Sequence, residues 1–154
     1  MLSLLLGTLS AFLISFCFAL IYNVHPKRLV AAGLNGMAGT ACMLLISRIW
    51  GVLPANVLAG VIISVMAELL ARHYHSPAIT FSIAALIPLV PGGGIYQTML
   101  ATIQGHGELA GQYATETLKI AACLVVGLLL ATSLRTLWKR KPPSFSEEEG
   151  DTFT

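Results

Sequence analysis

Long runs of apolar residues alternate with short polar corners along most of this chain, and one of the runs is interrupted by prolines and glycines. A helix rises about 1.5 Å per residue and the hydrocarbon core of a bilayer is about 30 Å thick, so a spanning helix needs about 20 mainly apolar residues. The pattern therefore predicts an all-α integral membrane protein with about five transmembrane helices, at residues 2–22, 29–47, 54–71, 79–103 and 113–137.

The fourth of these predicted spans is broken. Residues 76–107 carry no formal charge, but Pro88 and the Pro-Gly-Gly-Gly run at 91–94 interrupt the stretch. Proline lacks the N–H that a helix interior needs, so an uninterrupted helix is not expected here. The two halves, 79–90 and 95–103, are each too short to cross alone, which leaves either a discontinuous crossing helix or a re-entrant pair.

Composition agrees with a membrane protein and narrows the possible functions. Of the 154 residues, 56% are hydrophobic and only 10% are charged, with a mean hydropathy of +0.80. Soluble domains have about a quarter of their residues charged, and a net charge of +2 is too small to suggest a nucleic-acid partner. We therefore expect a transmembrane domain at 1–138, followed by a tail at 139–154 that is rich in Pro, Ser and acidic residues. That composition predicts a disordered cytoplasmic tail.

The distribution of basic residues favours one of the two arrangements of the broken region. If this region crosses, an external N-terminus places seven basic residues in the cytoplasm and two outside, as the positive-inside rule requires. If it re-enters, four lie inside and five outside. We therefore expect a broken crossing helix, with the N-terminus outside and the C-terminus in the cytoplasm. The seven residues are Lys27, Arg28, Arg72, Arg135, Lys139, Arg140 and Lys141, and the two are Arg48 and Lys119.

The break itself is the strongest candidate for a binding site. Non-helical backbone at membrane depth must be buried in protein or line a wet cavity, because lipid cannot satisfy its N–H and C=O groups. Gly92, Gly93 and Gly94 can adopt positive φ angles and place no side chain over their amides, which can then converge on an anion. The following helix, beginning near Ile95, adds its positive dipole end. A carboxylate suits such a site, whereas the alternative is a tight interhelical turn that binds nothing.

Four further polar residues are candidates for substrate contact. Tyr96 and Gln97 directly follow the break, where they could contact a substrate or serve as an interfacial tyrosine and a capping glutamine. Glu68 is the only acidic residue in the first three predicted spans and could bind a proton or a substrate ammonium group. Arg72 lies four residues further on, which favours a plain salt bridge with Glu68. Asn35 places an amide in the middle of the second span, where it needs a partner.

Small residues recur at helical spacing in two of the spans. Ala32, Gly36 and Thr40 repeat every four residues in the second span, and Gly60 and Ser64 do so in the third. Such stripes allow close helix approach, so we interpret them as packing surfaces and not as binding sites.

Several kinds of chemistry are not indicated. The three cysteines have no CxxC spacing, and His73 and His75 have no companions at metal-ligand spacing, so no metal or cofactor is expected. The glycine run lacks the Lys and Ser/Thr of a P-loop, and the GxSxG and HExxH motifs do not occur. We therefore expect that the chain is not an enzyme.

At these residues the sequence resembles the threonine/serine exporter (ThrE) family. The stretch 87–96, Ile-Pro-Leu-Val-Pro-Gly-Gly-Gly-Ile-Tyr, looks like the family signature, and it follows Ala-Glu-Leu-Leu-Ala-Arg at 67–72 and Pro-Ala at 77–78. The polar corner and glycine-rich helix at 26–36 also match, so the similarity covers roughly residues 10–138. The resemblance marks as site positions Pro88, Pro91, Gly92, Gly94 and Tyr96, with Gly93 a variable position between them.

The resemblance also implies a function. The chain is similar to the C-terminal half of the family, like the small YjjB-like proteins that occur with a separate YjjP-like membrane subunit. This implies a subunit of a two-component exporter in the inner membrane, driven by an ion gradient and not by ATP. The substrates implied are small carboxylates or hydroxy amino acids: threonine, serine or, in two-component relatives, succinate. The alternative is an accessory subunit that stabilises a transporting partner without binding substrate, and self-association of the chain stays open.

Overall fold

A computed structural model of the chain describes residues 2–138, and the tail predicted to be disordered lies outside them. Every regular element in the described part is helical, which confirms the predicted all-α fold. The elements are α1 (Leu2–Ile21), α2 (Pro26–Trp50), α3 (Val52–Tyr74), α4 (Ala78–Leu86), the short 3₁₀ helix η1 (Ile87–Leu89), α5 (Gly92–Ile103) and α6 (Gly107–Trp138).

Local sequence explains where the helices begin and end. Pro26 occupies the first turn of α2, where its missing N–H leaves no helix hydrogen bond unmade. Gly51 is the single residue between α2 and α3, and its φ of 89° lies in the region that favours glycine. His75 ends α3 in a left-handed conformation and donates its backbone N–H to Ala71 O. As a result, a single residue separates α2 from α3, whereas the apolar runs predicted spans that end at residue 47 and begin again at residue 54.

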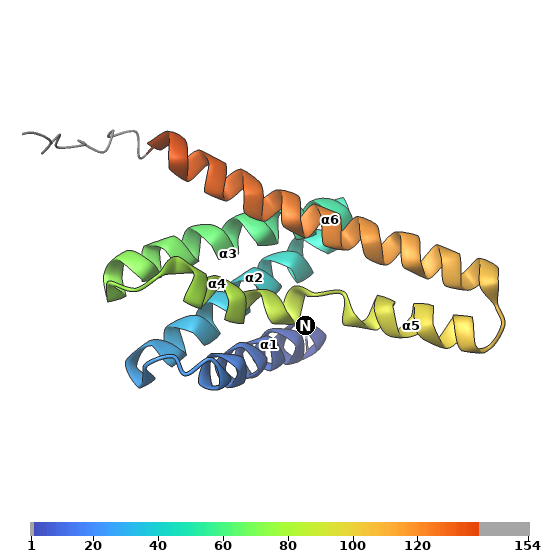
Figure 1. Ribbon diagram of the computed structural model, residues 1–154, viewed down its shortest axis with the longest axis horizontal. Coiled ribbons are helices and arrows are strands. Elements are labelled where there is room, and N and C mark those ends of the chain that lie inside the picture. Colours follow the sequence, from blue (N-terminus) through green and yellow to red (C-terminus); the bar gives the residue numbers. More distant parts are fainter. Residues whose placement is uncertain (1, 139–154) are drawn as a thin grey trace, which may run out of the picture.

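Four helices in the described part are long and apolar enough to cross a membrane, at Leu4–Ile21, Arg28–Trp50, Val52–Tyr74 and Gly107–Ser133. The broken segment makes a fifth span if its two parts, Ala78–Leu89 and Gly92–Ile103, are counted together. These parts are bent by 46°, so α5 continues in the general direction of α4 and does not turn back beside it (Figure 1). The chain is a multi-pass membrane protein.

Several corners and ends of the helices gather at one end of the molecule. The α1–α2 corner, the α3–α4 corner and the C-terminal end of α6 lie at one end of the molecule (Figure 1). The α5–α6 corner lies at the opposite end, beyond the other helices. The three elements at the first end therefore lie near one another in space.

Small side chains let the first four helices pack closely. α4 lies among α1, α2 and α3, and its Phe81 and Ala84 are fully buried in a core with Ala19, Ala32 and Ala67. A second core joins the break to α3 and α6 through Ile63, Leu89 and Leu124. By contrast, α5 packs mainly on α6, and α5 and the N-terminal part of α6 project together away from the bundle (Figure 1).

Two glycines let α3 and α6 cross with their backbones in contact. A Cβ atom at Gly60 would lie 2.8 Å from Leu124 O, and a Cβ atom at Gly127 would collide with Val57 O. Gly36 in α2 similarly faces Ser15 of α1 and the Cα of Ala85 in α4. Gly36 and Gly60, members of the two small-residue stripes, therefore lie in helix-packing surfaces, as the sequence predicted.

Candidate functional site

The break between α4 and α5 is built by its two prolines. Pro88 cannot donate a backbone hydrogen bond, and the chain tightens into η1, where the Val90 N–H donates to Ile87 O at 3.3 Å. Val90 is extended, and Pro91 has ψ of 59°, so the helix ends and restarts within two residues. The Gly92 N–H donates to Val90 O at 2.7 Å, which closes this turn.

The three glycines do not form the irregular backbone that the sequence predicted. Gly92, Gly93 and Gly94 make up the first turn of α5, which begins one turn earlier than the expected start near Ile95. Within residues 2–138, the glycines with positive φ are instead Gly51 and Gly105, in the short interhelical connections. Because Pro91 already supplies the sharp change of direction, the glycines are free to take helical dihedral angles.

Glycine at the start of α5 nevertheless exposes backbone amides. The Ile95 N–H donates to Pro91 O at 3.3 Å, whereas within residues 2–138 no backbone carbonyl accepts the N–H of Gly93 or Gly94. A Cβ atom at Gly92 or Gly93 would meet nothing within 4 Å, so an anion can approach the backbone there. Unpaired first-turn amides and the helix dipole together favour negative charge at this point.

Gly94 serves a different purpose from its two neighbours. A Cβ atom at this position would collide with Thr117 Oγ1 of α6 and lie 3.2 Å from Thr117 Cβ. Gly94 therefore permits the close approach of α5 to α6 and so holds the amide-bearing end of α5 in place. In the glycine run, Gly92 and Gly93 therefore have open space beside them, and Gly94 packs against α6.

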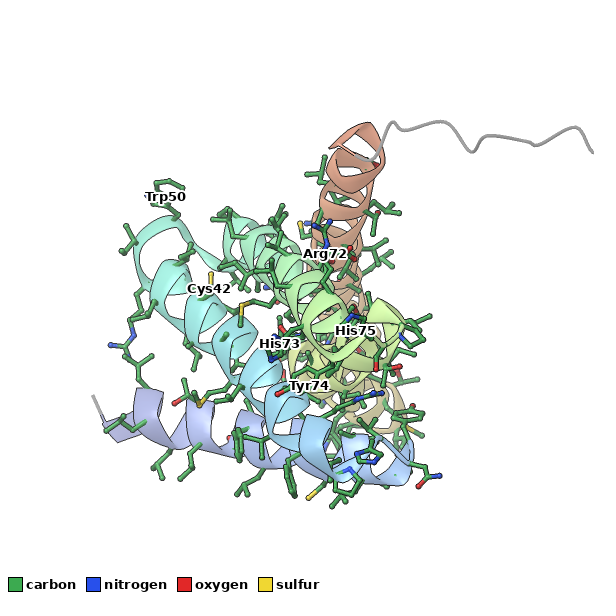
Figure 2. All side chains as sticks on the ribbon, turned by 90° about the vertical axis from the view of Figure 1, so that its left-hand side faces the viewer. Cys42, Trp50, Arg72, His73, Tyr74 and His75 are labelled. Atoms are coloured by element: carbon green, nitrogen blue, oxygen red, sulfur yellow. The ribbon has the colours of Figure 1, made fainter. Side chains whose placement is uncertain are left out.

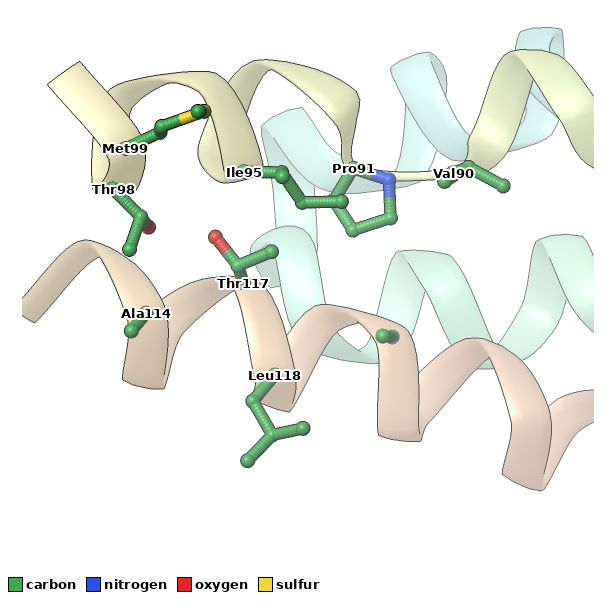
Figure 3. A pocket seen from close by; sticks show the side chains of 9 residues that line it. Val90, Pro91, Ile95, Thr98, Met99, Ala114, Thr117 and Leu118 are labelled. Atoms are coloured by element: carbon green, nitrogen blue, oxygen red, sulfur yellow. The ribbon is translucent and has the colours of Figure 1, made fainter.

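A groove of about 460 Å³ runs between the break and α6 (Figure 3). The hydroxyl of Thr98 donates to Gly94 O at 2.8 Å and that of Thr117 donates to Tyr113 O, so both are engaged within their own helices. The groove therefore offers mainly apolar contact beside the exposed amides. It is lined by Val90, Pro91, Ile95, Thr98, Met99, Ala114, Thr117, Leu118 and Ala121.

The α6 wall of this groove was not predicted from the sequence. Ala114, Thr117 and Ala121 form a stripe of small residues along one face of α6, which was a usable signal. The sequence could not identify its partner, because residues 92–103 pack on α6 only after the chain reverses at the α5–α6 corner.

Tyr96 and Gln97 do not line the groove. Both are exposed, Tyr96 at 67% of its surface, and they occupy faces of α5 that do not point at α6. In a membrane these faces contact lipid or another protein chain.

Asn35 is fully buried and joins three helices. Its Nδ2 donates to Ile63 O of α3 at 3.4 Å and to Phe81 O of α4 at 3.3 Å. The predicted mid-span amide thus has its partners. It fixes the first half of the broken span against α2 and α3, and no described contact joins it to the glycine run.

Glu68 forms the predicted salt bridge. Its Oε1 lies 3.1 Å from Arg72 Nε, with the Glu68 side chain 14% exposed and that of Arg72 58% exposed. Figure 2 shows Arg72, His73, Tyr74 and His75 around the C-terminal end of α3, an end that lies away from the break in Figure 1. Among the described residues, no cluster of three or more His, Cys, Asp or Glu side chains could hold a metal ion.

Comparison with known proteins identifies the family. The model of the threonine/serine exporter family, ThrE, matches residues 7–134. A threonine/serine exporter from Corynebacterium glutamicum is 31% identical over 122 residues, which cover 76% of this chain and 24% of that protein. An uncharacterized protein from Haemophilus influenzae is 31% identical over 107 residues, which cover 69% of this chain and 36% of that protein.

The chain therefore spans about a quarter to a third of the length of these relatives. No solved structure matches it. The matched family is one of transporters, in agreement with the expectation that the chain is not an enzyme. On this match, which covers most of the transmembrane region, the chain belongs to the threonine/serine exporter (ThrE) family.

Proposed function

We propose that this chain is the substrate-binding subunit of a two-component secondary exporter for small carboxylates or hydroxy amino acids. The observation that carries the proposal is the open first turn of α5. There the amides of Gly93 and Gly94 have no backbone acceptor, and nothing within 4 Å would cover Gly92 or Gly93. A substrate carboxylate accepts hydrogen bonds from these amides and interacts with the helix dipole.

The groove beside these amides supports binding of a small amphipathic molecule. Once the carboxylate is at the first turn of α5, the rest of the substrate extends between α5 and α6 toward Ile95 and Met99. Pro88 and Pro91 hold the break in shape, and Tyr96, Gln97 and Asn35 act around it and not at the carboxylate itself. We assign these roles because Pro91 lines the groove, whereas Tyr96, Gln97 and Asn35 do not.

The proposal includes a separate YjjP-like membrane subunit, in the inner membrane, with the N-terminus of this chain outside. The exposed face of α5 offers a surface for this subunit, since Tyr96 is 67% and Ile103 is 75% exposed and neither lines the groove. The α1–α2 corner, which precedes Arg28, and the α3–α4 corner, which follows Arg72, lie at the same end of the molecule (Figure 1). Assigning that end to the cytoplasm agrees with the positive-inside rule.

Efflux measurements test the two-component proposal directly. Cells preloaded with threonine or succinate and expressing this chain alone, its partner alone, or both should export only when both are present. A photoreactive substrate analogue should label this chain beside the break, within α5 or the facing part of α6. Export by the partner alone, or labelling of the partner only, would instead show that this chain is an accessory subunit.

Glu68 provides a test of substrate class. If its carboxylate binds a substrate ammonium group, Glu68→Gln should lower threonine export several-fold and leave succinate export unchanged, since succinate has no ammonium group. Arg72→Gln is the matched control, because it breaks the same salt bridge but keeps the carboxylate. Equal effects of the two substitutions on threonine export would assign Glu68 to the salt bridge alone.

A further inference from the structure

Two buried hydroxyl groups in the centre of the bundle have no hydrogen-bond partner. Ser15 of α1 is 0% exposed and Thr40 of α2 is 6% exposed, and within the described chain neither oxygen is paired. Several other helical hydroxyls donate to a carbonyl one turn earlier, namely those of Thr8, Ser82, Thr98, Thr117 and Thr132. Buried polar groups in proteins are almost always paired, so the two exceptions point to a ligand that they contact.

The helices that carry both hydroxyls pack against the end of the first half-helix. Gly36 faces Ser15 and also the Cα of Ala85 in α4, at 3.4 Å from the place of a Cβ atom. Thr40 lies one helical turn further along α2, next to Gly39, where a Cβ atom would collide with the Ile63 side chain of α3 and lie 3.8 Å from Leu89 Cδ1 of η1. These positions fall near the middle of the three spans to which they belong.

The end of α4 adds backbone oxygens to the same interface. The carbonyl of Ala84 cannot receive the usual hydrogen bond from four residues on, because that residue is Pro88. Ala84 is fully buried, and the C-terminal end of a helix carries a partial negative charge. Asn35 holds α4 in position through the Phe81 carbonyl, and its own Oδ1 is likewise unpaired.

We propose that Ser15 Oγ, Thr40 Oγ1 and the carbonyl end of α4 bind a dehydrated Na⁺ ion in the middle of the membrane. Neutral oxygens without a carboxylate suit a monovalent cation, whereas Ca²⁺ and Mg²⁺ sites use carboxylates. Gly36 lets α1 and α2 pack closely at Ser15, and Na⁺, the smaller ion, fits between closely packed helices more readily than K⁺. Unwound backbone at a half-helix C-terminus is a known kind of cation ligand in transporters.

The broken helix then presents opposite partial charges at its two inner ends. The carbonyl end of α4 meets α1 and α2, and the amide end of α5 meets the groove on α6. Movement of α4 relative to α5 at Pro91 would couple occupancy of the two ends. That coupling rests on the proposed exporter function, whereas Na⁺ binding does not.

Thermal unfolding of the purified full chain in detergent tests the site without substrate or partner. Titration with NaCl, with ionic strength held constant by choline chloride, should raise Tm saturably, and KCl should do so weakly. Ser15→Ala and Thr40→Val should each raise the half-saturating Na⁺ concentration about tenfold or more, because each removes a ligand oxygen. In choline chloride both variants should be as stable as the wild type or more so, since each removes an unpaired buried hydroxyl.

Ser82→Ala and Thr98→Val are the matched controls, since both remove hydroxyls already bonded within their helices, and both should keep the wild-type Na⁺ response. Equal Tm shifts in the three salts, or a wild-type response in Ser15→Ala, would overturn the proposal. If the variants fail to fold, saturable binding of radioactive Na⁺ to the wild type decides, and its absence would also overturn the site. If the purified chain binds Na⁺ but cells that express it with its partner export neither threonine nor succinate, only the exporter proposal is contradicted.

Discussion

Gly127→Val is expected to prevent α6 from packing on α3 and to leave little folded protein. Even a Cβ atom at this position would collide with the carbonyl oxygen of Val57, and a valine adds two methyl groups. Backbone cannot move aside as a flexible side chain does, so the two helices must separate. Overpacking in a core typically costs about 1–3 kcal/mol, and we expect the upper end of that range or more.

The yield of monodisperse protein after detergent extraction and its Tm should both fall sharply for this variant. Gly111→Val is the matched control on the same helix, because a Cβ atom at Gly111 would meet nothing within 4 Å. The two substitutions have the same intrinsic effect on helix propensity, so the difference between them measures the α3–α6 contact. Similar Tm values for the two variants would show that α6 does not cross α3 at these residues.

Sequence and structure agree most closely where a feature depends on one segment alone. The apolar runs indicated the long helices because bilayer thickness sets their length, and Pro88 and Pro91 indicated a break because proline cannot continue a helix. The pairing of Glu68 with Arg72 also followed, since their spacing of four residues is local.

The sequence was less informative where a feature depends on segments that are far apart. The identical neighbours Gly93 and Gly94 cannot be told apart by sequence, yet one is open and the other touches Thr117. Asn35 needed a partner, but only the packing of α2 against α3 and α4 identifies the Ile63 and Phe81 carbonyls. The sequence therefore indicated the chemical character of these residues, but it did not indicate which residues they contact.

This difference between adjacent glycines determines which substitution tests the substrate site. Gly94→Val would force α5 away from Thr117, so a loss of export by that variant would not distinguish binding from packing. Gly93→Val has open space for its side chain and requires no unusual backbone angle, because Gly93 lies in a helical turn without positive φ. Its fold should be preserved while its side chain crowds the amides that the carboxylate would contact.

We therefore expect Gly93→Val to lower efflux of threonine or succinate about tenfold or more, with normal expression, Tm and assembly with the partner. A hydrogen bond to a charged group contributes about 1.5–3 kcal/mol, which corresponds to a rate or affinity change of roughly 10- to 100-fold. Gly92→Val, on the other open position, should act in the same direction, whereas Gly111→Val, equally open but on α6, should export normally. Because the wild-type groove is mainly apolar, the carboxylate has few other donors to replace the lost amides. Normal efflux from well-folded Gly93→Val and Gly92→Val would place the substrate elsewhere in the complex.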